Sequence, residues 1–138
     1  MIRIQTDDFD PGIELEQLRQ ENNGQAGAIV SFTGLVRDLN EGDNITQLTL
    51  EHYPGMTEKA LTKIEAQANK QWDLTATLII HRVGPLTPND NIVLVVAASM
   101  HRKQAFQACE YMIDTLKTNA PFWKKEALQN SARWLTPG

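Results

Sequence analysis

Cationic side chains gather in the segment Ser99–Glu126, which carries a net charge of +2 in a chain whose overall charge is −4. Its bases are Arg102, Lys103, Lys117, Lys124 and Lys125, and its acids are Glu110, Asp114 and Glu126. A local excess of positive charge in a chain of negative net charge predicts a binding site for an anion. A solvated helix face has the same composition, so charge alone leaves both interpretations open.

Three cations stand in contexts that suit phosphate or acyl chemistry. Arg37 follows a predicted strand, and arginine binds phosphate oxygens through paired N–H donors. Lys117 and Lys124 lie on either side of a rigid Ala-Pro-Phe-Trp segment. Aromatic rings that exclude water lower the pKa of a lysine, which leaves more of its amine uncharged and able to act as a base or a nucleophile near neutral pH. Phe122 and Trp123 would also plug the end of a helix, and we expect both roles.

The spacing of apolar residues predicts a helix between Ser99 and Pro121. Ser99 is a suitable N-cap, and the residue before Pro121 resists the α conformation. The apolar positions recur at helical intervals, at Phe106, Cys109, Ile113 and Leu116.

This helix separates two groups of cations. His101 and Arg102 fall in its first turn, where free N–H groups and the helix dipole favour anions. Lys117 falls near its end, roughly 24 Å from His101 for a rise of about 1.5 Å per residue. One small ligand cannot touch both ends of a helix. Either the two groups are unrelated, or a second copy of the chain brings its helix start to this helix end.

The bulk composition predicts one globular domain over residues 1–138. A hydrophobic content of 41% and a charged content of 22% are ordinary for such a protein. The negative net charge argues against a general nucleic-acid or membrane-surface binder. Because the amino terminus has no apolar signal-peptide core and no run reaches transmembrane length, we expect a cytoplasmic protein.

The residue inventory argues against several kinds of site. Cys109 is the only cysteine, so neither an internal disulfide nor a cysteine metal cluster can form. Its place on the apolar stripe predicts a core residue and not a nucleophile. The histidines, His52, His81 and His101, lack metal-ligand spacing, and we expect no metal site. Neither a glycine-rich phosphate loop nor a serine nucleophile elbow occurs.

Hydrophobic periodicity predicts elements in the order β-α-β-β-α-β-β-α-β. The predicted strands are Ile2–Thr6, Ala26–Gly34, Ile45–Tyr53, Ala76–Val83, Asn91–Ala98 and Arg133–Leu135. The predicted helices are Ile13–Asn22, Thr57–Trp72 and the segment between Ser99 and Pro121. Leu39–Asn44 is predicted as a polar loop, and Gly84–Asp90 as a turn-rich connector. The mixed order favours an α+β sandwich, with helices covering one face of a largely antiparallel sheet.

Five blocks of sequence lie along residues 26–135. They are Phe32–Asp38 (FTGLVRD), Leu48–Leu61 (LTLEHYPGMTEKAL), Ile79–Gly84 (IIHRVG), His101-Arg102 and Leu116–Glu126 (LKTNAPFWKKE). Together, and in this order, they resemble the catalytic, large subunit of molybdopterin synthase. Leu35 and Ile113 stand where some members of that family carry lysine and methionine, so the lining of the pocket differs there.

The resemblance implies a fold, an assembly and a reaction. The family has a single-domain, hammerhead-type α+β fold and forms a homodimer. Each protomer binds a small ubiquitin-like sulfur carrier, which gives a heterotetramer. The carrier's C-terminal Gly-Gly thiocarboxylate enters a pocket, where two sulfurs pass to cyclic pyranopterin monophosphate (precursor Z) to form the dithiolene of molybdopterin. The chain would then be a sulfurtransferase of molybdenum cofactor biosynthesis that uses no cofactor of its own.

The resemblance also implies the residues of the site. The substrate-binding positions are Leu35, Val36, Arg37, His101, Arg102, Lys117, Lys124, Lys125 and Glu126. Lys117 is expected to transfer protons or to attack the carrier's acyl group, and Lys124 to anchor the substrate, so that both are catalytic. Arg37, His101 and Arg102 are expected to hold the phosphate and the pterin in a pocket shared across the homodimer.

Two other functions use the same cations. A non-enzymatic dimer could bind an anionic, nucleotide-like ligand for regulation, and it would need no protein partner. A purely structural assembly subunit is a third interpretation, although lysines clustered around an apolar wall would be an unusual choice for it. The residues alone leave these alternatives open.

Overall fold

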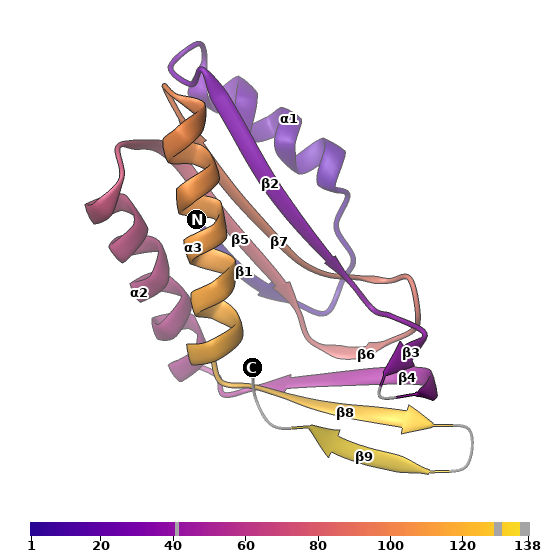
Figure 1. Ribbon diagram of the computed structural model, residues 1–138. Coiled ribbons are helices and arrows are strands. Elements are labelled where there is room, and N and C mark those ends of the chain that lie inside the picture. Colours follow the sequence, from indigo (N-terminus) through magenta and orange to yellow (C-terminus); the bar gives the residue numbers. More distant parts are fainter. Residues whose placement is uncertain (41, 129–130, 136–138) are drawn as a thin grey trace.

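The computed structural model describes residues 1–40, 42–128 and 131–135 (Figure 1). The helices are α1 (Pro11–Asn22), α2 (Met56–Gln71) and α3 (Arg102–Asn119). The strands are β1 (Ile2–Gln5), β2 (Ala28–Leu35), β3 (Leu39–Asn40), β4 (Asp43–His52), β5 (Leu74–Arg82), β6 (Gly84–Leu86), β7 (Asn91–Ser99), β8 (Phe122–Leu128) and β9 (Ala132–Leu135). No helix within the described ranges is long and apolar enough to cross a membrane.

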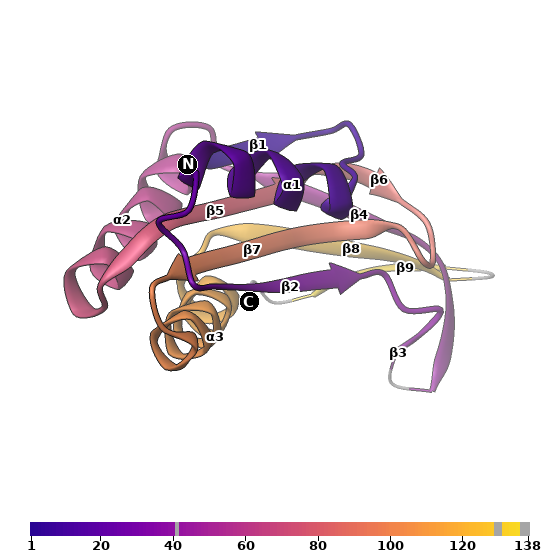
Figure 2. The same cartoon turned by 90° about the horizontal axis from the view of Figure 1, so that it is seen from above.

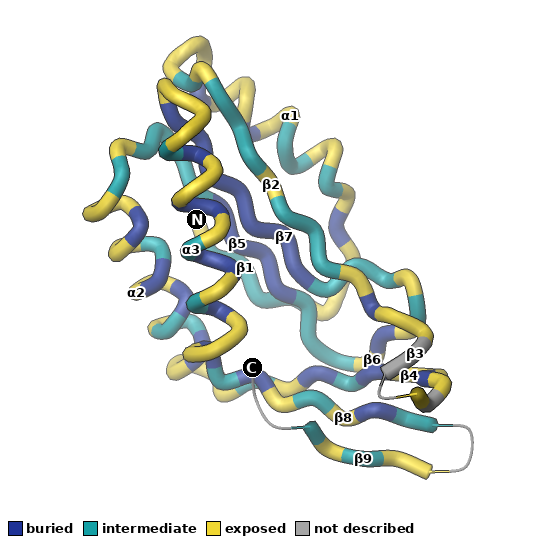
Figure 3. Tube along the Cα trace, in the orientation of Figure 1, coloured by how far each residue is buried: buried dark blue, intermediate teal, exposed yellow. Residues whose placement is uncertain are grey.

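The larger sheet has the strand order β1-β5-β7-β2. Its pairs are antiparallel except for β1 with β5, which is parallel. The central strands β5 and β7 carry the buried residues of the sheet, seen as dark blue segments in Figure 3. The predicted largely antiparallel α+β fold is therefore confirmed.

Helices pack on both faces of this sheet, so the expectation that they cover one face is wrong. Ile79 and Val95 face a core formed with α2 and α3, whereas Ile80 and Leu94 face a second core that contains Leu18 of α1. Figure 2 shows α1 and α3 on opposite sides of β5 and β7. The reason is that successive side chains of a strand point to opposite faces, and these strands are apolar at consecutive positions.

The start of α3 differs from its prediction. His101 is the N-cap, and Ser99 is the buried last residue of β7. The Ser99 hydroxyl donates to the carbonyl oxygen of Asp73 at 2.9 Å and accepts from the backbone N–H of His101 at 3.3 Å. Ser99 therefore links β7 to the entry of the helix without capping it.

The apolar stripe of α3 runs along one side of the helix. Its buried residues are Ala105, Ala108, Cys109, Met112, Ile113 and Leu116. Phe106, which was predicted to lie on this stripe, is 60% exposed. The small residues Ala105 and Ala108 face the sheet instead, where they allow the helix to approach it closely.

A second sheet crosses the lower end of the first in Figure 1. Its strand order is β3-β4-β8-β9, and β6 also pairs with β4. Pairing with β4 accounts for the three strands that the sequence analysis missed, β3, β6 and β8. Leu39–Asn44 is not a loop throughout, because β3 pairs with the start of β4 in a hairpin; Glu41 lies outside the described residues.

Candidate active site

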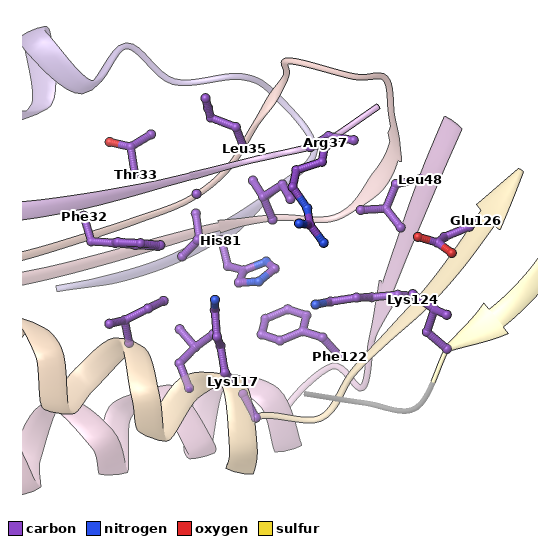
Figure 4. A pocket seen from close by; sticks show the side chains of 18 of the residues that line it. Phe32, Thr33, Leu35, Arg37, Leu48, His81, Lys117, Phe122, Lys124 and Glu126 are labelled. Carbon is purple, nitrogen blue, oxygen red and sulfur yellow. The ribbon is translucent and has the colours of Figure 1, made fainter. Parts of the chain in front are cut away.

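A cavity of about 800 Å³ lies where the end of β2, the last turns of α3 and the strand β8 meet. Three cationic side chains line it, those of Arg37, Lys117 and Lys124. The same cavity is walled by the rings of Phe32 and Phe122, among other apolar groups. Figure 4 shows the cationic ends reaching into the space between these walls. We call this space the basic cavity.

The end of β2 positions the first cation. Val36 is buried, its N–H donates to the carbonyl oxygen of Asp90 at 2.9 Å, and its own carbonyl accepts from the N–H of Asn89 at 2.8 Å. These two bonds fix the chain immediately before Arg37, whose side chain is exposed at the cavity. Leu35, the last residue of β2, is 48% exposed and also lines the cavity.

The two lysines come from elements that the core holds in place. Lys117 is exposed in the last turn of α3, next to Leu116, which is buried against the larger sheet. Lys124 lies on β8, where residues alternate between the two faces of the sheet. Phe122, Lys124 and Glu126 therefore all face the basic cavity.

The cavity alters the chemistry of Lys124. Burial lowers its pKa below the ordinary value, the positive charge of Lys117 lowers it further, and Glu126 opposes both effects. Burial acts in this direction because it disfavours the charged form of an amine. The ammonium of Lys117 lies 5.7 Å from the centroid of the Phe32 ring, in a cation–π contact. The lowered lysine pKa that the sequence predicted thus occurs at Lys124, with burial as its main cause.

Glu126 ties the cavity to the last strand. Its side chain is buried and accepts a hydrogen bond from Nε of Arg133 at 2.8 Å. Arg133 lies directly opposite Glu126 in the pairing of β8 with β9. This ion pair compensates a buried carboxylate, which would otherwise be costly to desolvate.

Three of the predicted site residues lie away from the basic cavity. His101 and Arg102 are exposed at the opposite end of α3, and neither lines the basic cavity. Lys125 points to the outer face of the second sheet, where its ammonium lies 5.5 Å from the centroid of the Trp134 ring. Successive side chains of a strand point to opposite faces of the sheet. Lys125 follows Lys124, which faces the cavity, and therefore points away from it.

His81 is a residue of the cavity that the sequence analysis missed. It is 3% exposed, and its ring stacks on Phe122 with centroids 3.7 Å apart and planes 13° apart. Burial lowers its pKa to about 4, despite a hydrogen bond to the backbone of Arg82, and the charges of Lys124 and His52 add to the decrease. A histidine directly after the apolar run Leu78–Ile80 was the signal that could have identified it.

Cys109 lies in the core, as predicted. Its thiol is buried between α3 and the larger sheet, and burial raises its pKa to about 11. A protonated, enclosed thiol is a poor nucleophile at neutral pH. Among the described residues, no group of three or more histidine, cysteine or acidic side chains could hold a metal ion.

The sequence matches the model of the MoaE protein family over residues 4–119. The molybdopterin synthase catalytic subunit of Ralstonia nicotianae is 54% identical over 134 residues, which cover 97% of this chain and 76% of that protein. The corresponding subunit of Pseudomonas aeruginosa is 52% identical over 134 residues, with coverages of 97% and 89%.

Solved structures agree with this assignment. Molybdopterin synthase from Staphylococcus aureus has a TM-score of 0.87 at 38% identity, covering 96% of this chain and 95% of that one. A molybdopterin biosynthesis MoaE protein from Burkholderia ambifaria has a TM-score of 0.85 at 50% identity, with coverages of 98% and 88%. These comparisons do not favour a regulatory or purely structural module. The chain belongs to the MoaE family, the catalytic subunits of molybdopterin synthase, enzymes of molybdenum cofactor biosynthesis.

Proposed function

We propose that this chain converts cyclic pyranopterin monophosphate to molybdopterin, with sulfur from the thiocarboxylated Gly-Gly end of a small carrier protein. The observation that carries the proposal is the convergence of Arg37, Lys117 and Lys124 on one partly apolar cavity. Its volume of about 800 Å³ suits a small-molecule ligand. Both reactants are anionic, through a phosphate in one and a thiocarboxylate in the other, and cations in a partly dry cavity attract them strongly.

Arg37 is the proposed phosphate ligand in this protomer. Its guanidinium supplies parallel N–H donors that match two phosphate oxygens. Its position at the cavity, directly after a backbone segment held by two hydrogen bonds, supports this role. A guanidinium cation at this position would favour the ionised form of the phosphate.

Lys117 is the proposed principal catalytic group. The sulfur of the carrier forms a bond to a carbon of the pterin side chain, and an oxygen substituent leaves that carbon as water or as a phosphate oxygen. The bond between that sulfur and the carrier's acyl carbon must then break. The Lys117 amine either attacks the acyl carbon, which forms an amide and leaves the sulfur on the pterin, or transfers protons for a water that does so. Its place beside Phe32, at the wall of the cavity, supports contact with a ligand there.

Lys124 is the proposed anchor for the substrate and the incoming thiocarboxylate. Burial, and then the positive charge of Lys117, make the ammonium form of Lys124 costly in the cavity, and its pKa is lowered as a result. An anion that enters would compensate this cost, so binding of substrate and protonation of Lys124 favour each other. This coupling is a physical reason to place a buried lysine where an anion must bind.

The proposed assembly is a homodimer in which each protomer also binds the carrier. Support comes from His101 and Arg102, which are exposed at the end of α3 remote from the basic cavity. A partner protomer could supply them to a shared site. A Helicobacter pylori chain of the same fold, with a TM-score of 0.82, is described as part of a complex of subunits 1 and 2 of molybdopterin-converting factor. We expect the reaction to take place in the cytoplasm.

The proposal is tested by mixing the purified chain with precursor Z and a thiocarboxylated carrier. One molecule of dithiolene product should form for every two thiocarboxylates consumed, because two sulfurs enter each product molecule. The carrier in its ordinary carboxylate form is the matched control and should give no product. Absence of dithiolene with a carrier that demonstrably binds the chain would refute the proposed reaction.

A further inference from the structure

His81 places one nitrogen of its ring inside the basic cavity in a defined chemical state. Nδ1 lies 2.8 Å from the carbonyl oxygen of Arg82. A carbonyl oxygen can only accept, so Nδ1 carries the ring hydrogen and donates it. In a neutral imidazole the other nitrogen, Nε2, is then an acceptor with a free lone pair.

The surroundings hold this ring neutral and in place. It is 3% exposed and stacked on Phe122, and the cations nearest to it would repel a second ring proton. The charged and titratable groups that act on it are Lys124 from β8 and His52 from β4. His52 is itself paired with Glu58 at 3.4 Å. No hydrogen bond to Nε2 is found among the described residues, and this nitrogen is not one of the fully buried polar atoms without a partner.

The polar groups of the basic cavity are mostly donors. Arg37, Lys117 and Lys124 can donate but cannot accept when charged. The carboxylate of Glu126 is an acceptor, but it already binds Arg133. In Figure 4 the His81 ring lies near the Phe122 ring, with the amine ends of the two lysines on either side. A ligand that brings an N–H group to this region needs an acceptor there, because a buried donor without a partner is costly.

We propose that Nε2 of His81 accepts a hydrogen bond from an N–H group of the ligand that enters the basic cavity. This inference rests on the proposed function, which supplies two sources of such a donor. One is the pterin, whose ring carries amide and amino N–H groups. The other is the backbone of the carrier's Gly-Gly tail. His81 would then select for a ligand with a donor at this position, while Phe122 fixes the plane of the ring.

The first test observes the nitrogen directly by ¹⁵N NMR of protein labelled at histidine. The free protein should show His81 with hydrogen on Nδ1 and none on Nε2. Addition of either cyclic pyranopterin monophosphate or the carboxylate form of the carrier should move the Nε2 resonance in the direction of hydrogen-bond acceptance, and the ligand that moves it identifies the donor. Hydrogen on Nε2 in the free protein, or no change with either ligand at saturation, would overturn the proposal.

The second test uses His81→Phe, which retains a ring on Phe122 and removes both nitrogens. Loss of one neutral hydrogen bond should weaken binding of one ligand about five- to tenfold and leave the other unchanged. Tyr111→Phe is the control, because Tyr111 packs against Trp72 and does not line the cavity, and both affinities should be normal. Equal weakening of both ligands, or of neither, contradicts the proposal. If His81→Phe does not fold, the NMR test of the unmodified chain decides.

The two proposals fail in different ways. If the unmodified chain makes dithiolene and His81 shows no response to either ligand, the inference is wrong and the proposed function stands. If the chain binds the ligands with the expected His81 response but makes no dithiolene, the proposed function is wrong.

Discussion

Lys117 and Lys124 reach the same cavity from two different elements, and the charge of Lys117 lowers the pKa of Lys124. The last turn of α3 carries the first lysine, and the inner face of β8 carries the second. Only seven positions separate them in the sequence, but the chain turns at Pro121 between them. A change at Lys117 should therefore alter the pKa of Lys124.

Removal of Lys117 should raise the pKa of Lys124. Replacement by methionine in Lys117→Met removes a nearby positive charge, which stabilises the protonated form of Lys124. Burial still acts on Lys124 in this variant, so its pKa should remain below the ordinary value. The measurement is the pH dependence of acylation at Lys124, followed by peptide mass spectrometry. Since only the neutral amine reacts, the midpoint should move to higher pH.

The control for this measurement is Lys103→Met. Lys103 is exposed near the start of the same helix and does not line the basic cavity. Its removal should leave the acylation midpoint of Lys124 unchanged. An unchanged midpoint in Lys117→Met as well would show that the charge of Lys117 does not act on Lys124.

Lys117→Ala should reduce sulfur transfer by a factor on the order of 10² or more, as expected when a general acid–base or nucleophilic group is lost. The side chain is exposed, so the melting temperature should change little. The experiment is a single-turnover reaction with thiocarboxylated carrier and precursor Z, which separates chemistry from product release. A rate close to that of the unmodified chain would remove Lys117 from the mechanism.

Cys109→Ala should retain sulfur transfer at nearly the normal rate. The thiol is buried, its pKa is raised to about 11 by that burial, and the carrier supplies the sulfur in the proposed reaction. The small cavity left behind should cost about 1 kcal/mol of unfolding free energy, measured by urea denaturation. A folded variant without activity would contradict the assignment of Cys109 to the core.

The same burial predicts the behaviour of the unmodified thiol. A thiol reagent should label Cys109 in the native chain only at the rate of local or global opening. Labelling should become rapid in denaturant. Rapid labelling of the native protein at neutral pH would show that the thiol is accessible, in contrast to its burial between α3 and the sheet.

Sequence patterns predicted the regular elements of the larger sheet, since their apolar runs are long and their ends carry turn residues. They did not predict that α1 packs on the face opposite α3. Ile80 and Leu94 are buried as deeply as Ile79 and Val95, and a strand that is apolar on both sides requires cover on both. Continuous apolar runs in β5 and β7 were the available signal.

The second sheet was harder to predict because its strands depend on pairing. Phe122–Leu128 contains two lysines and a glutamate in seven residues, and it forms a strand because β4 and β9 hydrogen-bond to it on either side. Propensity for a strand is weak without such neighbours. Because side chains alternate between the two faces of a strand, Lys124 faces the cavity and Lys125 faces outward. The spacing of the two lysines in the sequence could not show which of them faces inward.

The site was predicted in part. Arg37, Lys117, Lys124 and Glu126 meet at one cavity, and the sequence suggested them through their residue types and a family resemblance. His81 was missed because its relevance depends on a stack with Phe122, 41 positions further along the chain. His101 lies at the other end of α3 and does not line this cavity, which agrees with the predicted distance between the two ends of the helix.

Lys117 and Arg102 lie at opposite ends of α3, so a site that is shared between two protomers can be tested by complementation. Lys117→Ala and Arg102→Ala should each be inactive or nearly so as homodimers, if one protomer supplies Lys117 and its partner supplies Arg102. In a mixed dimer, one site carries both substitutions and the other carries neither, because a two-fold axis relates the two sites. After random exchange of subunits, half of the dimers are mixed and each has one intact site. The mixture should therefore recover about a quarter of the normal activity.

The recovered activity separates a shared site from two independent functions of the helix ends. A mixture of Lys117→Ala with Lys124→Ala is the matched control, since both residues line the cavity of the same protomer. A mixed dimer of that pair would carry one damaged lysine in each site, and no activity should return. If the Lys117→Ala and Arg102→Ala mixture also stays inactive after confirmed exchange, Arg102 does not act at the partner's cavity. The cations at the start of α3 would then serve another purpose.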